Sequence, residues 1–118
     1  MAAPNIISAT SIIGKTNANW ITTSFVAVLD NASNSNQVLR INSLYVSNLG
    51  AQDATVTVDF YRGGVGYCLV NASVVPVGTS SLPIAKDTSI YVEEGDQLRI
   101  KSNLAGILQY VISYEVMS

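Results

Sequence analysis

Apolar and polar residues alternate along most of this chain with a period of two. This period is typical of antiparallel strands that have one covered face. In residues 54–62 the apolar side chains occupy every second position, and the last segment repeats the pattern. The inward face of that last segment is predicted to consist of Leu108, Tyr110, Ile112, Tyr114 and Val116.

The pattern predicts about eight strands and no long helix. Turn-forming Gly, Asn and Asp residues separate the apolar runs, because they tolerate left-handed backbone angles. A change of phase predicts a bulge near Asn42 and Ser43. The fold expected is all-β, a single antiparallel β-sandwich with jelly-roll topology favoured. The strands are expected at residues 6–16, 21–29, 38–48, 54–62, 67–75, 89–92, 97–102 and 107–116.

The chain has 118 residues, which suffices for one domain with a single two-layer core. The sandwich domain is predicted over residues 6–118, preceded by a flexible arm at residues 1–5. Two interpretations of the arm stay open, namely a frayed terminus and a contact with a neighbouring subunit. The contact residues would be Ala2, Ala3, Pro4 and Asn5.

The composition favours a protein that is in permanent contact with other subunits. Charged residues make up 12% of the chain, against about 25% in a typical soluble domain. The chain has 14 Ser, 8 Thr and 10 Asn, and its net charge is -2. An isolated domain normally relies on a charged surface to stay dispersed. We therefore expect a homo-oligomer or a larger assembly, with Ile107 and Val111 on the outward face of the last strand as candidate subunit contacts.

Several partner classes are disfavoured. The six Lys and Arg residues are scattered, so the chain lacks the basic patch with which proteins neutralise nucleic-acid phosphates. No apolar run is long enough to span a bilayer, and the first residues lack the basic and apolar regions of a signal peptide. Neither nucleic acid nor a membrane is an expected partner.

The residues available for catalysis are few. Histidine is absent, which removes the commonest general base and the commonest metal ligand. Cys68 is the single cysteine and is predicted to be a small buried hydrophobe. We therefore expect no enzymatic activity and no cofactor.

The one acidic cluster consists of Asp87, Glu93, Glu94 and Asp96. A flexible loop with several carboxylates could bind Ca²⁺, but the spacing is irregular. The favoured interpretation is a turn in which Gly95 takes a positive φ and Asp96 accepts hydrogen bonds from backbone N–H groups, closing a hairpin between residues 90–92 and 98–100. No metal site is therefore predicted.

Two further motifs have competing interpretations. The Gly-rich stretch at residues 63–66 could suggest a phosphate-binding loop, but a hairpin tip is favoured because no helix signal follows it. Trp20 follows the polar residues 17–19, which resemble a turn at a strand start. It is a possible sugar-stacking residue, although aromatic residues in strands more often pack against other strands.

Four segments together resemble a known class of protein, the small β-sandwich virion proteins of tailed bacteriophages, in particular those of cyanophages. They are residues 39–48, 54–58, 90–98 and 112–115, and the resemblance extends over residues 38–116. Such proteins are capsid decoration (cement) subunits or neck and tail components, and often trimers. The resemblance implies non-catalytic assembly on a virion and provides no site residues.

The expected function is therefore that of a capsid decoration subunit, located in the virion after assembly in the host bacterial cytoplasm. Its partners would be copies of itself, as a homotrimer, and the major capsid protein or another virion protein. Shell contacts would involve the N-terminal arm and the loops at residues 31–36 and 63–66. The alternative is a carbohydrate-binding or tail adhesion module that uses Trp20.

Overall fold

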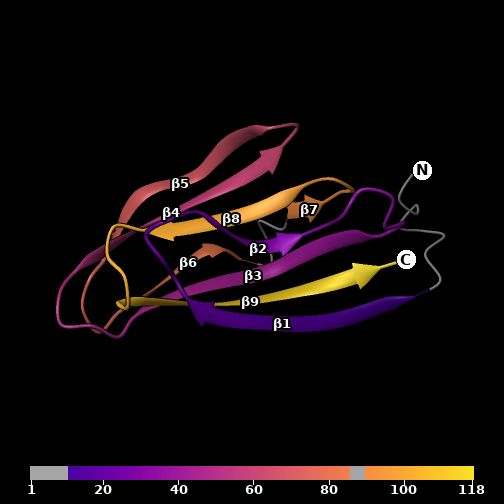
Figure 1. Cartoon of the computed structure of the whole chain (residues 1–118). Coiled ribbons are helices and arrows are strands. Elements are labelled where there is room, and N and C mark those ends of the chain that lie inside the picture. The colour runs from indigo at the N-terminus through magenta and orange to yellow at the C-terminus, as the bar shows by residue number, and fades with distance from the viewer. Residues whose placement is uncertain (1–10, 86–89) are drawn as a thin grey trace.

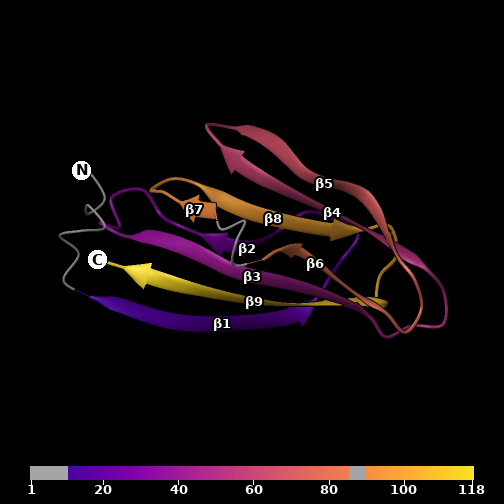
Figure 2. The same cartoon turned by 180° about the vertical axis from the view of Figure 1, so that it is seen from behind.

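The computed structural model describes residues 11–85 and 90–118, and these form nine strands and no helix. The strands make two antiparallel sheets that face each other (Figures 1 and 2). The strands are β1 (Ile12–Trp20), β2 (Val26–Asp30), β3 (Val38–Asn48), β4 (Ala54–Arg62), β5 (Val65–Val75), β6 (Ser80–Ile84), β7 (Ile90–Val92), β8 (Gln97–Ser102) and β9 (Leu108–Met117).

The strand order is that of a jelly roll. Sheet A has the order β1-β9-β3-β6, with β7 also paired to β3, and sheet B has the order β2-β8-β4-β5. The chain passes from one sheet to the other at nearly every connection, as in a sandwich of two interlocked Greek keys. The predicted all-β sandwich is confirmed. The described residues form nine strands, whereas about eight were predicted. The reason is that two short strands, β6 and β7, pair with different parts of β3.

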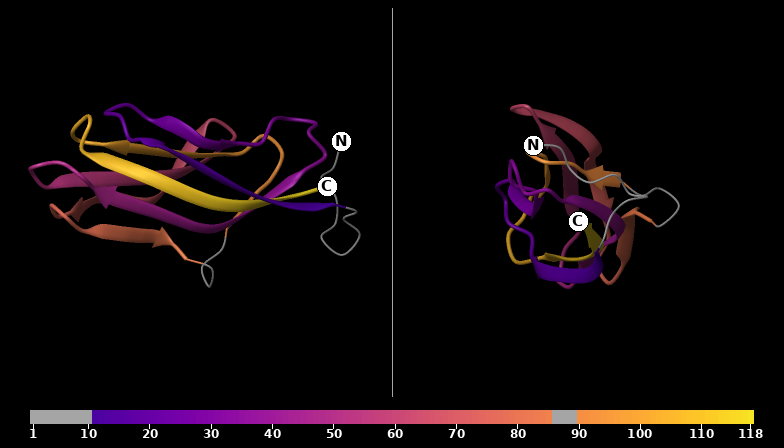
Figure 3. Two further views of the ribbon diagram at one scale, coloured as in Figure 1. Left: turned by 90° about the horizontal axis from the view of Figure 1, so that it is seen from below. Right: turned by 90° about the vertical axis from the view of Figure 1, so that its right-hand side faces the viewer.

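The core lies between the two sheets, which Figure 3 shows as separate layers. On β9 the predicted inward face is confirmed, because its first four members are buried and Val116 is half-buried. These side chains are covered by apolar residues of sheet B. The fully buried apolar residues of sheet B include Val56, Val58, Leu98 and Ile100.

The first strand differs from its prediction. β1 spans Ile12–Trp20, whereas residues 6–16 were expected, of which 6–10 lie outside the described residues. Residues 17–19 belong to the strand instead of forming a turn, and Trp20 ends the strand instead of starting one. The physical reason is that all nine positions of β1 are exposed, so nothing imposes an alternation of apolar and polar side chains.

Two other predictions of local structure were wrong. β6 was missed, since its sequence SSLPI is short, begins with two serines and contains Pro83, which a strand tolerates at a sheet edge. The acidic turn does not close a hairpin, because β7 pairs with β3 in sheet A while β8 pairs with β2 and β4 in sheet B. The turn instead connects the two sheets.

The predicted bulge near Asn42 and Ser43 and the predicted hairpin tip at residues 63–66 are confirmed. The prediction that Cys68 is buried was wrong. The pairing of β3 with β9 shifts between Ile41 and Ser43. Gly63 and Gly64, with φ of 61° and 80°, form the two-residue tip between β4 and β5. Cys68 is exposed, because β5 is an edge strand that the other sheet leaves almost wholly uncovered.

Candidate functional surfaces

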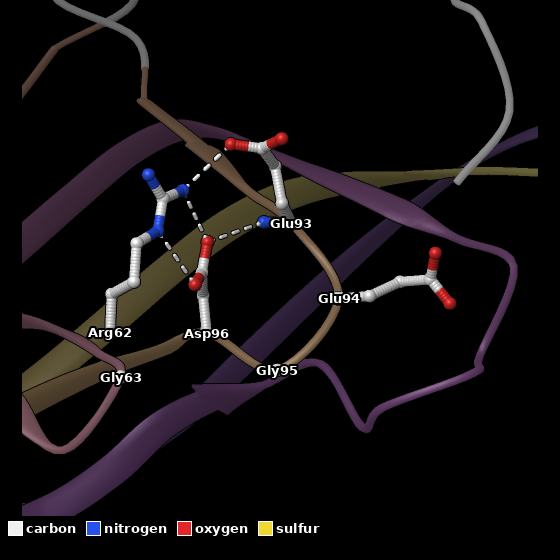
Figure 4. A pocket seen from close by; sticks show the side chains of 6 residues that line it. All are labelled: Arg62, Gly63, Glu93, Glu94, Gly95 and Asp96. Atoms are coloured by element: carbon white, nitrogen blue, oxygen red, sulfur yellow. Dashed lines mark hydrogen bonds and ion pairs between the residues drawn. The ribbon is translucent and has the colours of Figure 1, made fainter. Parts of the chain in front are cut away.

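The acidic turn is built around Asp96, whose carboxylate is buried between β4 and β7. Arg62, at the end of β4, donates from Nε to Asp96 Oδ1 over 2.9 Å and from Nη2 to Oδ2 over 2.6 Å. The same Nη2 donates to Glu93 Oε2 over 2.7 Å (Figure 4). The hydrogen bond to Asp96 raises the pKa of Arg62 above its ordinary value. The guanidinium therefore stays charged and fixes both carboxylates.

Backbone bonds complete this turn and attach it to the loop between β2 and β3. Asp96 Oδ2 accepts from the Glu93 N–H over 3.0 Å, and Gly95 has φ of 86°, as predicted for a turn. Gly95 N–H donates to the Asn31 carbonyl over 2.7 Å, and Asn31 N–H donates to the Asp96 carbonyl over 3.0 Å. Asn31 is buried and its amide also donates to the Val92 carbonyl. From sequence Asn31 was expected only as a turn residue in the loop at residues 31–36, because nothing distinguishes it there from the other asparagines.

The described carboxylates of the cluster serve the fold. Glu94 points away from Arg62 (Figure 4) and accepts from the Asn36 N–H over 3.1 Å. Asp87 lies outside the described residues. Within the described ranges, no group of three His, Cys, Asp or Glu side chains is placed to hold a metal ion. The hollow of about 400 Å³ beside the turn is lined by carboxylates that already have protein partners.

A second ion pair lies on the outer face of sheet B. Arg99 donates from Nε to Asp59 Oδ1 over 2.9 Å and from Nη2 to Oδ2. The guanidinium lies 4.0 Å from the ring centroid of Tyr61 and 4.5 Å from that of Phe25. Gly66 of β5 allows this close approach, because a Cβ there would lie 2.4 Å from Asp59 Oδ2. The hydrogen bond to Asp59 raises the pKa of Arg99.

The outer face of sheet A has an apolar strip, which we define as Ala18, Trp20, Tyr45 and Val111. Val111 pairs with Ala18 of β1 on one side and with Tyr45 of β3 on the other. Trp20, Tyr45 and Val111 are 47%, 48% and 42% exposed. A hollow of about 210 Å³ lies beside Trp20. The structure thus brings Trp20, predicted for ligand contact, next to Val111, predicted for subunit contact, and tests neither role.

The other predicted contact residues lie elsewhere. Ile107 precedes β9, is half-buried, and packs against the core and against Gly50, where a Cβ would meet its side chain. Ile107 therefore offers a neighbouring subunit less apolar surface than Val111 does. The predicted arm residues Ala2, Ala3, Pro4 and Asn5 lie outside the described residues.

Two strands at sheet edges, β1 and β5, are exposed along almost their whole length. β1 is at one edge of sheet A and pairs only with β9 among the described strands. Ile12 and Ile13 on β1 are 58% and 52% exposed. β5 is at one edge of sheet B, pairs only with β4 there, and exposes Tyr67 and Leu69.

Comparisons with known proteins show a similar fold and no sequence family. No protein-family model matches the chain, and no curated protein matches it significantly in sequence. Among solved structures, the chain is similar to a protein of Bacillus endospore appendages, described as a novel family of disulfide-linked pili. That similarity has a TM-score of 0.55 and 19% identity, and covers 99% of this chain and 96% of the other. The likeness shows the fold alone.

A second solved structure is a pentameric capsid protein isolated from metagenomic phage sequences. It aligns with a TM-score of 0.45 and 16% identity over 83% of this chain and 59% of its own length, a similarity on which no argument is based. None of the described residues belongs to a helix long and apolar enough to cross a membrane.

Proposed function

We propose that this protein is a non-catalytic structural subunit of a tailed-bacteriophage virion, a capsid decoration subunit that assembles with copies of itself as a homotrimer and binds the shell through repeated contacts. The observation that supports this most is β1, an edge strand exposed at all nine positions. The jelly-roll fold and the low charge of the chain agree with the proposal.

An edge strand presents unpaired N–H and C=O groups, and monomeric proteins protect such edges with lysines, prolines, bulges or short length. β1 has nine residues, contains Lys15 but no proline, and runs along β9 without a register shift. Ile12, Ile13 and Trp20 add exposed apolar surface. An edge with so little protection is suited to pairing with another chain.

The apolar strip of sheet A lies next to this edge, since Ala18 and Trp20 are themselves part of β1. A partner paired to β1 would extend sheet A and could cover the strip as well. Each contact would be modest, but contacts repeated by symmetry act together, so that the whole assembly is far more stable than one interface.

The test is the mass of the purified full-length chain, measured by size-exclusion chromatography with light scattering over a range of concentrations. The wild type is expected to form trimers or larger particles. Ile13→Lys, which adds a charge to the exposed edge, is expected to shift the protein toward monomers without lowering its melting temperature. Gln52→Lys adds the same charge in an exposed loop and should leave the mass unchanged.

A wild-type protein that stays monomeric at high concentration would contradict the assembly proposal. The virion assignment has its own test, which is the binding of the purified protein to isolated phage capsid shells, followed by co-sedimentation. Assembly without shell binding would support a structural role outside the capsid.

A carbohydrate-binding or tail adhesion module is the second candidate function. The observation in its favour is the hollow beside Trp20, which is also lined by the polar residues Asn19 and Gln109. Exposed indole rings stack on sugar faces while neighbouring amides bond to hydroxyls. Binding to a glycan array that Trp20→Ala abolishes would favour this candidate.

A further inference from the structure

A polar hollow of about 380 Å³ lies on the outer face of sheet B, away from the strip on sheet A. Its volume is within the range of small-molecule sites. The described residues that line it include no carboxylate and one cation, and their polar side chains include those of Thr23, Thr55, Thr57, Asn71, Asn103 and Lys101.

Among the described residues, Lys101 has no carboxylate partner. Each of the three arginines in the described ranges forms an ion pair, with Glu115, with Glu93 and Asp96, or with Asp59. Lys101 forms none there, and its Nζ lies 4.6 Å from the ring centroid of Phe25. The aromatic ring favours a fixed place for the ammonium group. A cation held at the wall of a hollow can attract an anion.

Hydrogen-bond donors line the same hollow as this ammonium group. Within the described residues, no hydrogen bond engages the side chains of Thr23, Thr55 or Asn71. Asn103 uses its Oδ1 to accept from the Thr55 N–H over 2.8 Å, which leaves its NH₂ group to donate. Thr57 Oγ1 accepts from the backbone N–H of residue 72 over 3.0 Å, so its O–H also remains as a donor.

The strand that forms one wall is irregular at this point. The pairing of β4 with β5 shifts between Val56 and Val58, so that Asn71 and Ala72 together oppose one residue of β4. Ala72 has φ of 48°, a left-handed angle that is unfavourable for alanine. Bulges and strained residues occur preferentially at functional sites, where they redirect side chains. Here the bulge places residues 71 and 72 at the hollow.

We propose that this hollow binds an acidic saccharide, with Lys101 pairing with the carboxylate and the threonine and asparagine side chains bonding to the sugar hydroxyls. An oxyanion satisfies the unpaired ammonium group, and neighbouring hydroxyls satisfy the free donors. The absence of carboxylates from the lining avoids repulsion of such a ligand. This site is separate from the hollow beside Trp20 and does not depend on the proposed assembly.

The test is saturation-transfer difference NMR on the purified full-length protein, with glucuronate, glucose and sodium sulfate as separate probes. Glucuronate is expected to bind more tightly than glucose, which lacks the anion, and more tightly than sulfate, which lacks the sugar hydroxyls. Lys101→Gln should weaken glucuronate binding about tenfold, as expected for the loss of one hydrogen bond to a charged group.

Lys15→Gln is the matched control, because Lys15 also has no carboxylate partner among the described residues but lies on β1, away from the hollow. It should leave binding unchanged. Equal affinity for glucose and glucuronate would overturn the role of the anion. Equal affinity for sulfate and glucuronate would overturn the saccharide assignment. Glucuronate binding that persists in Lys101→Gln with an unchanged melting temperature would overturn the site itself.

Discussion

Gly66 lies against the ion pair of Asp59 and Arg99, and the space there excludes a side chain. A Cβ at this position would lie 2.4 Å from Asp59 Oδ2 and 2.9 Å from Arg99 Nη2. Because Asp59 is 5% exposed and held by two hydrogen bonds, its carboxylate has little room to move. The pair is thus fixed from one side by a residue that contributes nothing except its small size.

Gly66→Ala is therefore expected to destabilise the protein by about 1–3 kcal/mol, the range found for overpacking. Gly14→Ala is the control, since a Cβ at Gly14 would meet nothing within 4 Å. Urea unfolding, followed by circular dichroism, measures both. Equal midpoints for the two variants would show that the ion pair can move aside.

Tyr110 should make the stability of the protein depend on alkaline pH. Burial raises the pKa of its phenol above the ordinary value of 10.0. Above about pH 10 the unfolded chain releases this proton more readily than the folded chain does. The free energy of unfolding should therefore fall as the pH rises from about 10 toward the raised pKa. Tyr110→Phe should reduce this decline, and the measurement is urea unfolding at a series of alkaline pH values.

Asp59 shows what can and cannot be predicted for a single residue. Its alternation with Val58 correctly puts it on the face of β4 opposite the core. Its burial could not be predicted, since it depends on Arg99 from β8 and on the close approach of Gly66 from β5. The same holds for Asn31, whose partners lie up to 65 positions away along the chain.

At the level of the element, the turn between β7 and β8 connects the two sheets through Asp96. Removing this buried carboxylate by Asp96→Ala leaves Arg62 Nε and the Glu93 N–H without their partner, while Arg62 Nη2 keeps only Glu93. We expect a loss of about 2–4 kcal/mol, as for other broken networks of this kind.

Asp30→Ala is the control for this turn. Asp30 ends β2, is exposed, and makes no side-chain hydrogen bond to any described residue. Its removal should change the unfolding free energy by less than about 0.5 kcal/mol. Thermal unfolding of both variants is the measurement. A similar small change for Asp96→Ala would mean that the backbone bonds to Asn31 suffice to hold the turn.

The covered strands could be predicted from sequence by their alternation of apolar and polar residues, and the uncovered edge strand β5 by its run of apolar residues. β3, β4, β8 and β9 have alternating burial, and their apolar residues repeat at the same spacing. The edge strands β1 and β6 lack this signal. β1 is uncovered along its length, and β6 is short, so that polar residues are tolerated in both. Which sheet a short strand such as β7 joins depends on partners distant in sequence.

At the level of the whole molecule, the low charge of the chain has a consequence for assembly. Contacts through strand edges and apolar side chains depend little on screening, unlike contacts through ion pairs. The mass of the assembled protein should therefore stay constant from about 0.05 M to 1 M NaCl. Light scattering at each salt concentration is the measurement, and dissociation at high salt would indicate that surface charges hold the subunits together.

The jelly-roll architecture could be predicted from the number of strands and from their turn chemistry. The functional surfaces could be predicted only in part. Val111 was expected on the outward face, where it lies, but the polar hollow around Lys101 was not foreseen. That hollow combines β4, β5, β8 and two loops, and no local spacing in the sequence indicates that these segments meet.

The exposed edge at β1 also limits which stoichiometries are possible. If β1 of one copy pairs with β1 of another, the two strands are related by a two-fold axis, and growth stops at a dimer because both edges are used. A trimer requires β1 to bind a different surface of the next copy, such as the edge at β5. Every copy then presents one donor surface and one acceptor surface, and the rotation between copies decides whether the chain of contacts closes as a ring or continues as a filament.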